Sequence, residues 1–210
     1  MITSTLLRLV IALAGLAFMS AGANAHPHVW VTMTSEVVYA PDGSVTGVRQ
    51  AWTFDDMYTA FATQGLEAKK KGEFTREELA PLAEVNVGSL KEFDYFTYAR
   101  VDGKKTPFAA PADYWLEYKD NMLTLRFTLP FATPVKAKSL DIEVFDPGYF
   151  VDFSFTEKNP VALVKAPEQC KLALARPNDA SIVMPGQSAG EALANNYGAQ
   201  FANKISVKCP

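Results

Sequence analysis

The chain has 210 residues, of which 49% are hydrophobic and 20% charged, with a formal net charge of −3. This length and composition predict a globular protein, and the lack of a long basic run argues against nucleic-acid binding. With only two histidines, both near the N-terminus, the body of the chain has no histidine to serve as a catalytic base.

The first 25 residues have the pattern of a secretory signal peptide. Arg8 precedes an apolar run over residues 9–19, and Ala23-Asn24-Ala25 is an A-x-A cleavage site. The run is shorter than the roughly 20 apolar residues that a membrane span requires, which disfavours an uncleaved anchor. We therefore expect a periplasmic protein without a membrane span, whose mature residues 26–210 form a single domain.

Cleavage after Ala25 makes His26 the N-terminal residue, and His28 follows two positions later. The α-amine and imidazole of an N-terminal histidine can close a chelate ring on one metal ion. In an extended segment, alternate side chains point to opposite faces. One face would have His26, His28 and Trp30, and the other would have Val29, Val31 and Met33. The two imidazoles therefore share a face. The alternative is that both histidines lie at the solvated end of an edge strand.

Pro27 restricts the kind of metal site, because it has no backbone N–H for the square-planar mode that uses deprotonated amides. Imidazole, amine and carboxylate ligands remain, which suit Zn, Ni, Co or Cu. The candidate carboxylates are Asp55, Asp56, Asp146 and Asp152, near aromatic residues at predicted strand ends. Alternative roles are a helix N-cap for Asp55 and an Asx turn for Asp146.

Alternating apolar and polar residues predict a β-hairpin over residues 29–39 and 45–54, around the turn at residues 41–44. A capping aspartate and a capping-box spacing from Thr75 to Glu78 predict two helical segments within residues 56–96. A short helix at 190–203 is also plausible. The fold class expected is α+β, a mainly antiparallel β-sandwich with a helix-loop-helix insertion. Further strands are predicted at residues 97–101, 114–118, 123–129, 140–145, 149–155 and 205–208.

The segment from Glu67 to Glu78 has the skeleton of a 12-residue calcium loop, with Gly72 at the sixth position and Glu78 at the last. Lys69 and Lys71, however, occupy positions where carboxylates should neutralise the ion. Adjacent ammonium groups repel Ca²⁺, so the sequence predicts a helix-loop-helix that does not bind calcium.

Cys170 and Cys209 are the only cysteines. An even number of cysteines in an exported chain predicts a disulfide bond between them. Their separation of 39 residues is that of a structural cross-link and not of a C-x-x-C redox or zinc pair. Walker, H-E-x-x-H and G-x-G-x-x-G motifs are absent, so we do not expect an enzyme.

Five segments carry a family resemblance: residues 26–31, 52–56, 67–78, 90–98 and 145–150. Together they resemble the domain-of-unknown-function family 1007 over most of the mature chain up to about Cys170. Members are exported proteins described as periplasmic components of ABC-type transport systems, similar in setting to partners of nickel/cobalt-type efflux permeases. The resemblance implies association with metal transport and supplies no ligand set. Relatives have an acidic calcium-like loop, from which the lysines of this chain depart.

These observations predict a periplasmic accessory protein that binds Zn, Ni, Co or Cu through His26 and His28 and exchanges it with a membrane permease. One alternative is a metal-free β-sandwich interaction module, because a fold alone does not determine function. Another is a copper enzyme with a histidine brace. That brace takes its other histidine from a distant strand, whereas the second histidine here lies only two residues away.

Overall fold

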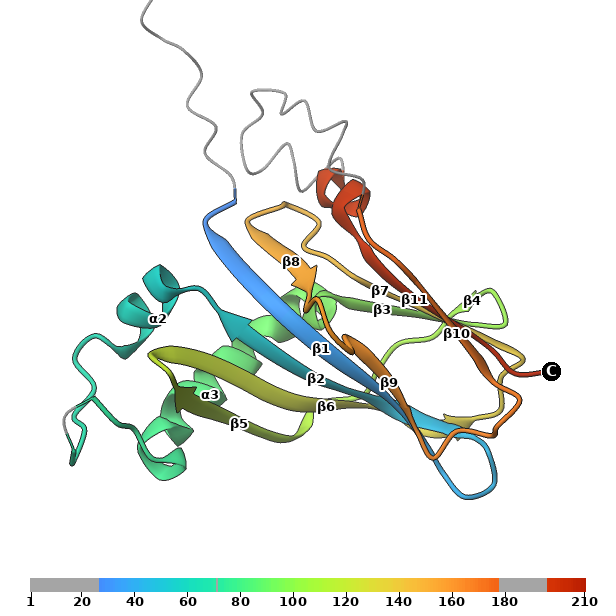
Figure 1. The fold of residues 1–210 in the computed structure, drawn as a ribbon, viewed down its shortest axis with the longest axis horizontal. Coiled ribbons are helices and arrows are strands. Elements are labelled where there is room, and N and C mark those ends of the chain that lie inside the picture. The colour runs from blue at the N-terminus through green and yellow to red at the C-terminus, as the bar shows by residue number, and fades with distance from the viewer. Residues whose placement is uncertain (1–26, 71, 178–195) are drawn as a thin grey trace, which may run out of the picture.

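Two β-sheets make up most of the structure, with the two α-helices beside the first sheet (Figure 1). The computed structural model describes residues 27–70, 72–177 and 196–210. The first sheet has the order β5-β6-β2-β1-β8, with β9 also paired to β1, and the second has the order β10-β11-β7-β3-β4. The predicted α+β class is confirmed. The strands are β1 (Val29–Tyr39), β2 (Val45–Phe54), β3 (Thr97–Val101), β4 (Lys104–Lys105), β5 (Ala112–Lys119), β6 (Met122–Val135), β7 (Ser139–Val144), β8 (Val151–Phe155), β9 (Val161–Val164), β10 (Lys171–Ala175) and β11 (Asn203–Lys208).

Strands β1 and β2 form the predicted hairpin with the predicted bounds. In the turn, the Asp42 carboxylate accepts hydrogen bonds from the Ser44 amide at 3.0 Å and the Ser44 hydroxyl at 2.6 Å, and Gly43 supplies the positive φ of 80°. Alternate residues of both strands are buried, and Trp52 is only 1% exposed. The hairpin therefore buries one face in the core and leaves the other face outside.

The helical insertion lies where the sequence predicts it. Helix α2 (Asp56–Thr63) is capped by Asp55, and helix α3 (Arg76–Leu90) by the predicted capping box of Thr75 and Glu78. The segment η1 (Lys91–Phe96) then leads into β3. Helix α3 buries Leu79, Ala83 and Val87 in the core beside β5. None of the helices in the described ranges is long and apolar enough to cross a bilayer.

Side chains from both sheets and from α3 belong to one hydrophobic core. Buried polar groups also join the sheets. The Gln50 side-chain amide donates to the Thr97 hydroxyl at 3.4 Å and accepts from the Ser35 hydroxyl at 2.6 Å. The Asn203 amide donates to the Phe153 carbonyl. Because a buried polar group left unbonded is costly, these contacts favour one relative placement of the two sheets.

Strands β8 and β9 pair with β1 in the parallel direction, whereas all other pairings between described strands are antiparallel. Val151 is the partner of Val29 in β8, and Val161 that of Ser35 in β9. Residue alternation reports which side chains are buried and says nothing about the direction of the neighbouring strand. The parallel pairings therefore could not be predicted from the sequence pattern.

Several predicted bounds need correction. Strand β8 starts at Val151 and not at residue 149, because the backbone up to that point is held in a loop by Asp146. Strand β6 extends to Val135, beyond the predicted end at residue 129. Strands β4, β9 and β10 were not predicted, and β11 begins at Asn203. In the predicted helix at 190–203, residues 190–195 lie outside the described ranges. The rest contains a 3-10 helix, η3 (Tyr197–Phe201), and the first residue of β11.

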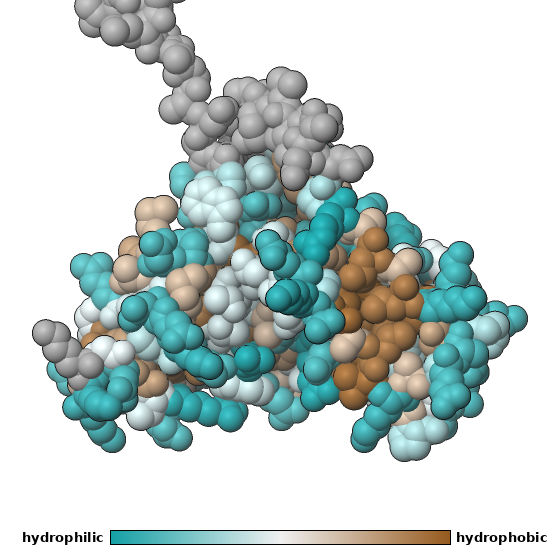
Figure 2. All heavy atoms as spheres, viewed as in Figure 1, coloured by the Kyte–Doolittle hydropathy of each residue, from teal (hydrophilic) through white to brown (hydrophobic). Residues whose placement is uncertain are grey.

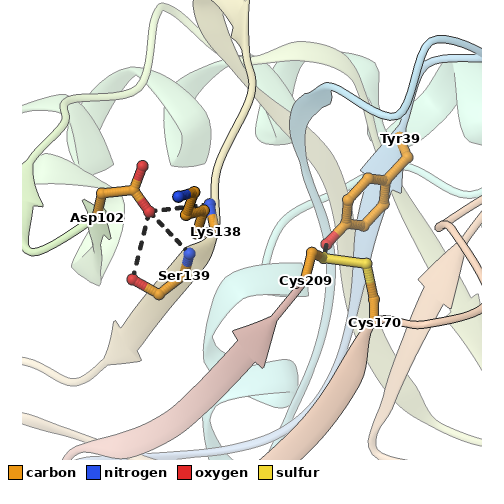
Figure 3. The surroundings of a disulfide bond; sticks show 6 residues. All are labelled: Tyr39, Asp102, Lys138, Ser139, Cys170 and Cys209. Carbon is orange, nitrogen blue, oxygen red and sulfur yellow. Dashed lines mark hydrogen bonds between the residues drawn. A yellow bond between two sulfur atoms is a disulfide. The ribbon is translucent and has the colours of Figure 1, made fainter.

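The predicted disulfide between Cys170 and Cys209 is present, with the two Cα atoms 4.2 Å apart. It joins the segment before β10 to the end of β11, and the Tyr39 hydroxyl lies 3.8 Å from the Cys209 sulfur (Figure 3). Nearby, the Asp102 carboxylate accepts from the Lys138 and Ser139 amides at 2.9 and 2.8 Å. The disulfide thus fixes the edge of the second sheet to the rest of that sheet.

Apolar side chains gather over β9 and toward β10 on the face drawn in Figure 2. Both are edge strands: in the described ranges, β9 pairs only with β1, and β10 only with β11. Leu174 of β10 is 40% exposed, although its neighbours across the pair, such as Ile205, are buried. This apolar patch is therefore a part of the core that stays exposed between the edges of the two sheets.

Candidate metal site at the start of the first strand

His28 lies immediately before β1 and is exposed. Its backbone N–H donates to the Phe150 carbonyl at 2.8 Å, and its ring lies 4.6 Å from the Phe150 ring, tilted by 34°. The predicted alternation of faces is confirmed, because His28 and Trp30 are exposed while Val29 and Val31 are buried. His26, the other histidine of the predicted site, lies outside the described residues.

Three neighbouring strands place two of the candidate aspartates beside Trp30. Asp152 of β8 is the register partner of Trp30 in β1. On the other side, the Trp30 amide donates to the Asp55 carboxylate at 2.8 Å, and the Asp55 amide donates to the Trp30 carbonyl at 3.0 Å. We call Asp55, Trp30 and Asp152 the acidic row. Trp30 and Asp152 lie on the outer face of the sheet, two residues along from His28, whereas the Asp55 carboxylate is bound to backbone amides.

Asp55 has two structural tasks. One carboxylate oxygen accepts from the Trp30 amide, and the other accepts from the Tyr58 amide at 2.8 Å, which caps helix α2. The capping role is the alternative that the sequence offered for this residue. Asp56 follows in the first turn of α2, where its exposed side chain interacts favourably with the helix dipole.

Asp146 is only 5% exposed, and its carboxylate organises the loop before β8. One oxygen accepts from the Gly148 amide at 2.8 Å, as in the predicted Asx turn. The other accepts from the amides of Phe150 and Val151 at 2.9 and 3.0 Å. Asp146 therefore has a structural role beside the site, because it positions Phe150, whose carbonyl and ring contact His28.

Tyr58, whose amide donates to the Asp55 carboxylate, also has an oxygen that could bind a metal. Burial raises the pKa of its phenol, and the nearby Asp55 carboxylate raises it further. The hydrogen bond that the hydroxyl donates to the Asn86 side chain at 3.3 Å lowers the pKa and offsets part of this rise. Its ring stacks on Phe54 with centroids 4.4 Å apart. Tyr58 is therefore a neutral packing residue at neutral pH and not a phenolate ligand.

In the part of the chain that the structure describes, no three His, Cys, Asp or Glu side chains form a group that could hold a metal ion. The acidic row and His28 share one face, whereas Asp146 is turned into its own loop. A complete site at this place needs the ligands that His26 would add. Sequence reasoning missed Phe150, since only the parallel pairing of β8 brings it to His28.

The calcium-like loop is closed by hydrogen bonds of its own. The Glu78 carboxylate accepts from the Thr75 amide at 2.8 Å and from the Lys69 amide at 3.0 Å, and these bonds lower the pKa of Glu78. The Lys70 ammonium pairs with Glu73 at 2.6 Å, and Gly72 takes the positive φ of 81°. Glu78 thus binds backbone amides from the position where a calcium loop binds its ion.

Comparison with known proteins identifies the class of this chain. The model of the family described as "Protein of unknown function (DUF1007)" matches residues 11–209. The chain belongs to this family, as the sequence motifs predict. An uncharacterized protein of Haemophilus influenzae is 25% identical over 200 residues, covering 91% of this chain and 95% of the relative. An uncharacterized 15.5 kDa protein in the trpE 3' region of Spirochaeta aurantia is 32% identical over 93 residues, covering 44% and 66%.

Proposed function

We propose that this is an exported metal-binding protein that holds a divalent transition metal at its mature N-terminus and exchanges it with a membrane permease. The ligands proposed are the α-amine and imidazole of His26, the imidazole of His28 and the carboxylate of Asp152. The observation that carries the proposal is that β1 and β8 put Asp152 on the same face as His28, next to the strand end where the chain's only histidines lie.

The chemistry of these groups fits a transition metal. Imidazole, amine and a single carboxylate suit Zn, Ni, Co or Cu, whereas Ca²⁺ requires six or more oxygen ligands. Asp55 is a weaker candidate, because each of its oxygens already accepts one backbone N–H. Asp146 fits a structural role best, since its buried carboxylate accepts three.

Exchange with a protein partner is supported by the surroundings of His28. Trp30 and Phe150 flank it and are 44% and 47% exposed. Exposed aromatic side chains are enriched where proteins contact partners. A ligand at the end of a strand, beside two such rings, is open to an incoming protein. The partner implied by the family resemblance is the permease of a metal transport system.

The test is a competition titration of processed protein with Zn²⁺, Ni²⁺, Co²⁺ and Cu²⁺ between about pH 6 and 8. Metal must displace protons from groups with ordinary pKa values of about 6.5 for imidazole and 7.7–8.0 for the α-amine. We therefore expect affinity to fall as the pH is lowered through this range. Protein with His26→Ala and His28→Ala together should lose specific binding.

Glu36→Gln is the matched control, because Glu36 is a carboxylate on the same strand and the same face as Trp30. It lies six residues further along, or about 20 Å at the rise of a strand, and should have no effect on metal affinity. If the double-histidine variant binds these metals as tightly as the parent, the proposed site is wrong. Tight binding that requires neither histidine would place the ligands elsewhere.

A further inference from the structure

A cavity lies on the outer face of the second sheet, separate from the proposed metal site. Its volume is about 560 Å³, which falls within the 300–1,000 Å³ typical of small-molecule sites. Strands β3, β7 and β11 lie side by side beneath it, with β4 at the edge (Figure 1). The lining residues that matter here are Tyr98, Arg100, Lys105, Asp141, Glu143 and Lys204.

Of the two acidic side chains in this set, only Glu143 is paired with a cation. Glu143 forms an ion pair with Lys204 at 2.7 Å, and the Asp141 carboxylate accepts from the Ser206 hydroxyl at 2.6 Å. Among the described residues, no three His, Cys, Asp or Glu side chains could hold a metal ion, so the cleft is not a second metal centre of that kind. Arg100, Lys105 and Lys204 outnumber Asp141 and Glu143, so the lining carries one net positive charge.

Arg100 and Lys105 supply that charge. They are directly opposite each other in the β3–β4 pair, and we call them the cationic pair. Neither forms an ion pair with a carboxylate in the described ranges, although Asp141 is the register partner of Arg100 on the other side. Like charges directly opposite on neighbouring strands are destabilising. An anion between the two would remove this repulsion.

The cleft also has an aromatic floor. The rings of Tyr98 and Phe145 lie 4.7 Å apart, and the Tyr98 hydroxyl donates to the Phe93 carbonyl at 3.3 Å. Burial raises the pKa of the Tyr98 phenol, and the nearby carboxylates of Asp94 and Asp146 raise it further. Tyr98 is therefore neutral at neutral pH and does not repel an anion.

Strained backbone borders the cleft. Asp94, Tyr95 and Phe96 are three successive non-glycine residues with positive φ angles of 51°, 55° and 48°. Asp94 and Tyr95 line a smaller cavity of about 160 Å³ that shares Tyr98 and Lys105 with the larger one. Such conformations are costly and cluster at ligand sites. This observation is independent of the charge argument.

We propose that this cleft binds a small organic acid that has an aromatic or apolar body. Its carboxylate would lie between the Arg100 guanidinium and the Lys105 ammonium, and its body would cover the rings of Tyr98 and Phe145. A planar guanidinium binds a carboxylate through two parallel hydrogen bonds, and the ammonium adds a third donor. The neutral amide of the same acid cannot form these charge-assisted bonds.

The test compares each acid with its own amide. The full mature protein is titrated by NMR with benzoate and benzamide, and with phenylacetate and phenylacetamide. Hydrogen bonds to charged groups favour the acids, which should bind about tenfold or more tightly than their amides. In protein carrying Arg100→Gln and Lys105→Gln, this advantage should disappear. Arg49→Gln, which removes an arginine paired with Glu36 on the first sheet, should preserve it.

The melting temperature and the measured affinities together distinguish ligand binding from a structural role. Removing the like-charge pair should leave the melting temperature unchanged or raise it, so a clear fall would show that the cationic pair stabilises the fold and would overturn the proposal. Equal affinities of acid and amide in the parent, no saturable binding of either, or an acid preference that survives in the double variant would each overturn it as well.

Discussion

The acidic row and the cationic pair are built in the same way and offer opposite chemistry. Each is a set of side chains that neighbouring strands bring together. The acidic row is on the first sheet, and the cationic pair is on the second. In the first, carboxylates lie beside a histidine; in the second, the cations of the cleft outnumber its carboxylates by one, and only Glu143 is paired with a cation. The ligand class of a sheet face therefore depends on which charges the neighbouring side chains leave unneutralised.

The largest effect expected separates two aspartates in the first region. Asp146→Ala removes the acceptor of three backbone N–H groups, and each such loss costs roughly 1–3 kcal/mol. We expect a loss of about 3 kcal/mol or more in the free energy of unfolding, measured in urea. Asp56→Ala, as the matched change of an exposed aspartate in the first turn of α2, should cost about 1 kcal/mol or less. Equal stabilities of the two variants would contradict the structural role of Asp146.

A smaller effect concerns the calcium-like loop, which belongs to neither region. Hydrogen bonds from the Thr75 and Lys69 amides lower the pKa of Glu78 in the folded protein. The stability that it contributes is therefore fully present above the ordinary glutamate pKa of about 4.3 and lost as the pH falls through the lower folded value. Glu78→Gln should slightly lower the melting temperature at pH 7, and the difference should shrink below about pH 4.

Calcium provides the control for this loop. Because Lys69 and Lys71 occupy ligand positions, the parent should show no saturable heat with Ca²⁺ at about millimolar concentration. A saturable heat that disappears in Glu78→Gln would show that the loop still binds the ion. A stability difference that does not change with pH would show that the Glu78 carboxylate does not contribute through its ionised form.

Local patterns in the sequence predicted much of the fold. Alternation placed the β1–β2 hairpin with its observed bounds and assigned His28 and Trp30 to the outer face. Capping residues located both helices, and cysteine count predicted the disulfide. These features are set by residues near each other in sequence or by simple pairing chemistry. The same locality explains why Asp55 was recognised as a possible cap.

What could not be predicted depends on which strands become neighbours. Asp152 lies beside Trp30 only because β8 runs parallel to β1, and no alternation pattern reports that pairing. The cleft is similar, since Arg100 and Lys204 come from strands that meet only through β7. The edge strands β9 and β10 were missed because they are short and carry a weak alternation. The accuracy of the prediction was therefore limited by long-range strand register and not by the local propensities of the residues.

One residue added at the N-terminus moves the α-amine without changing a side chain. Mature protein beginning at His26 is compared with the same protein carrying one added glycine ahead of His26, by competition titration with Zn²⁺ and Ni²⁺ at pH 7.5. Both imidazoles and Asp152 remain, while the amine can no longer close a chelate ring with the His26 imidazole. We predict that affinity falls by about tenfold or more in the extended protein. Equal affinity of the two forms would contradict an N-terminal metal site.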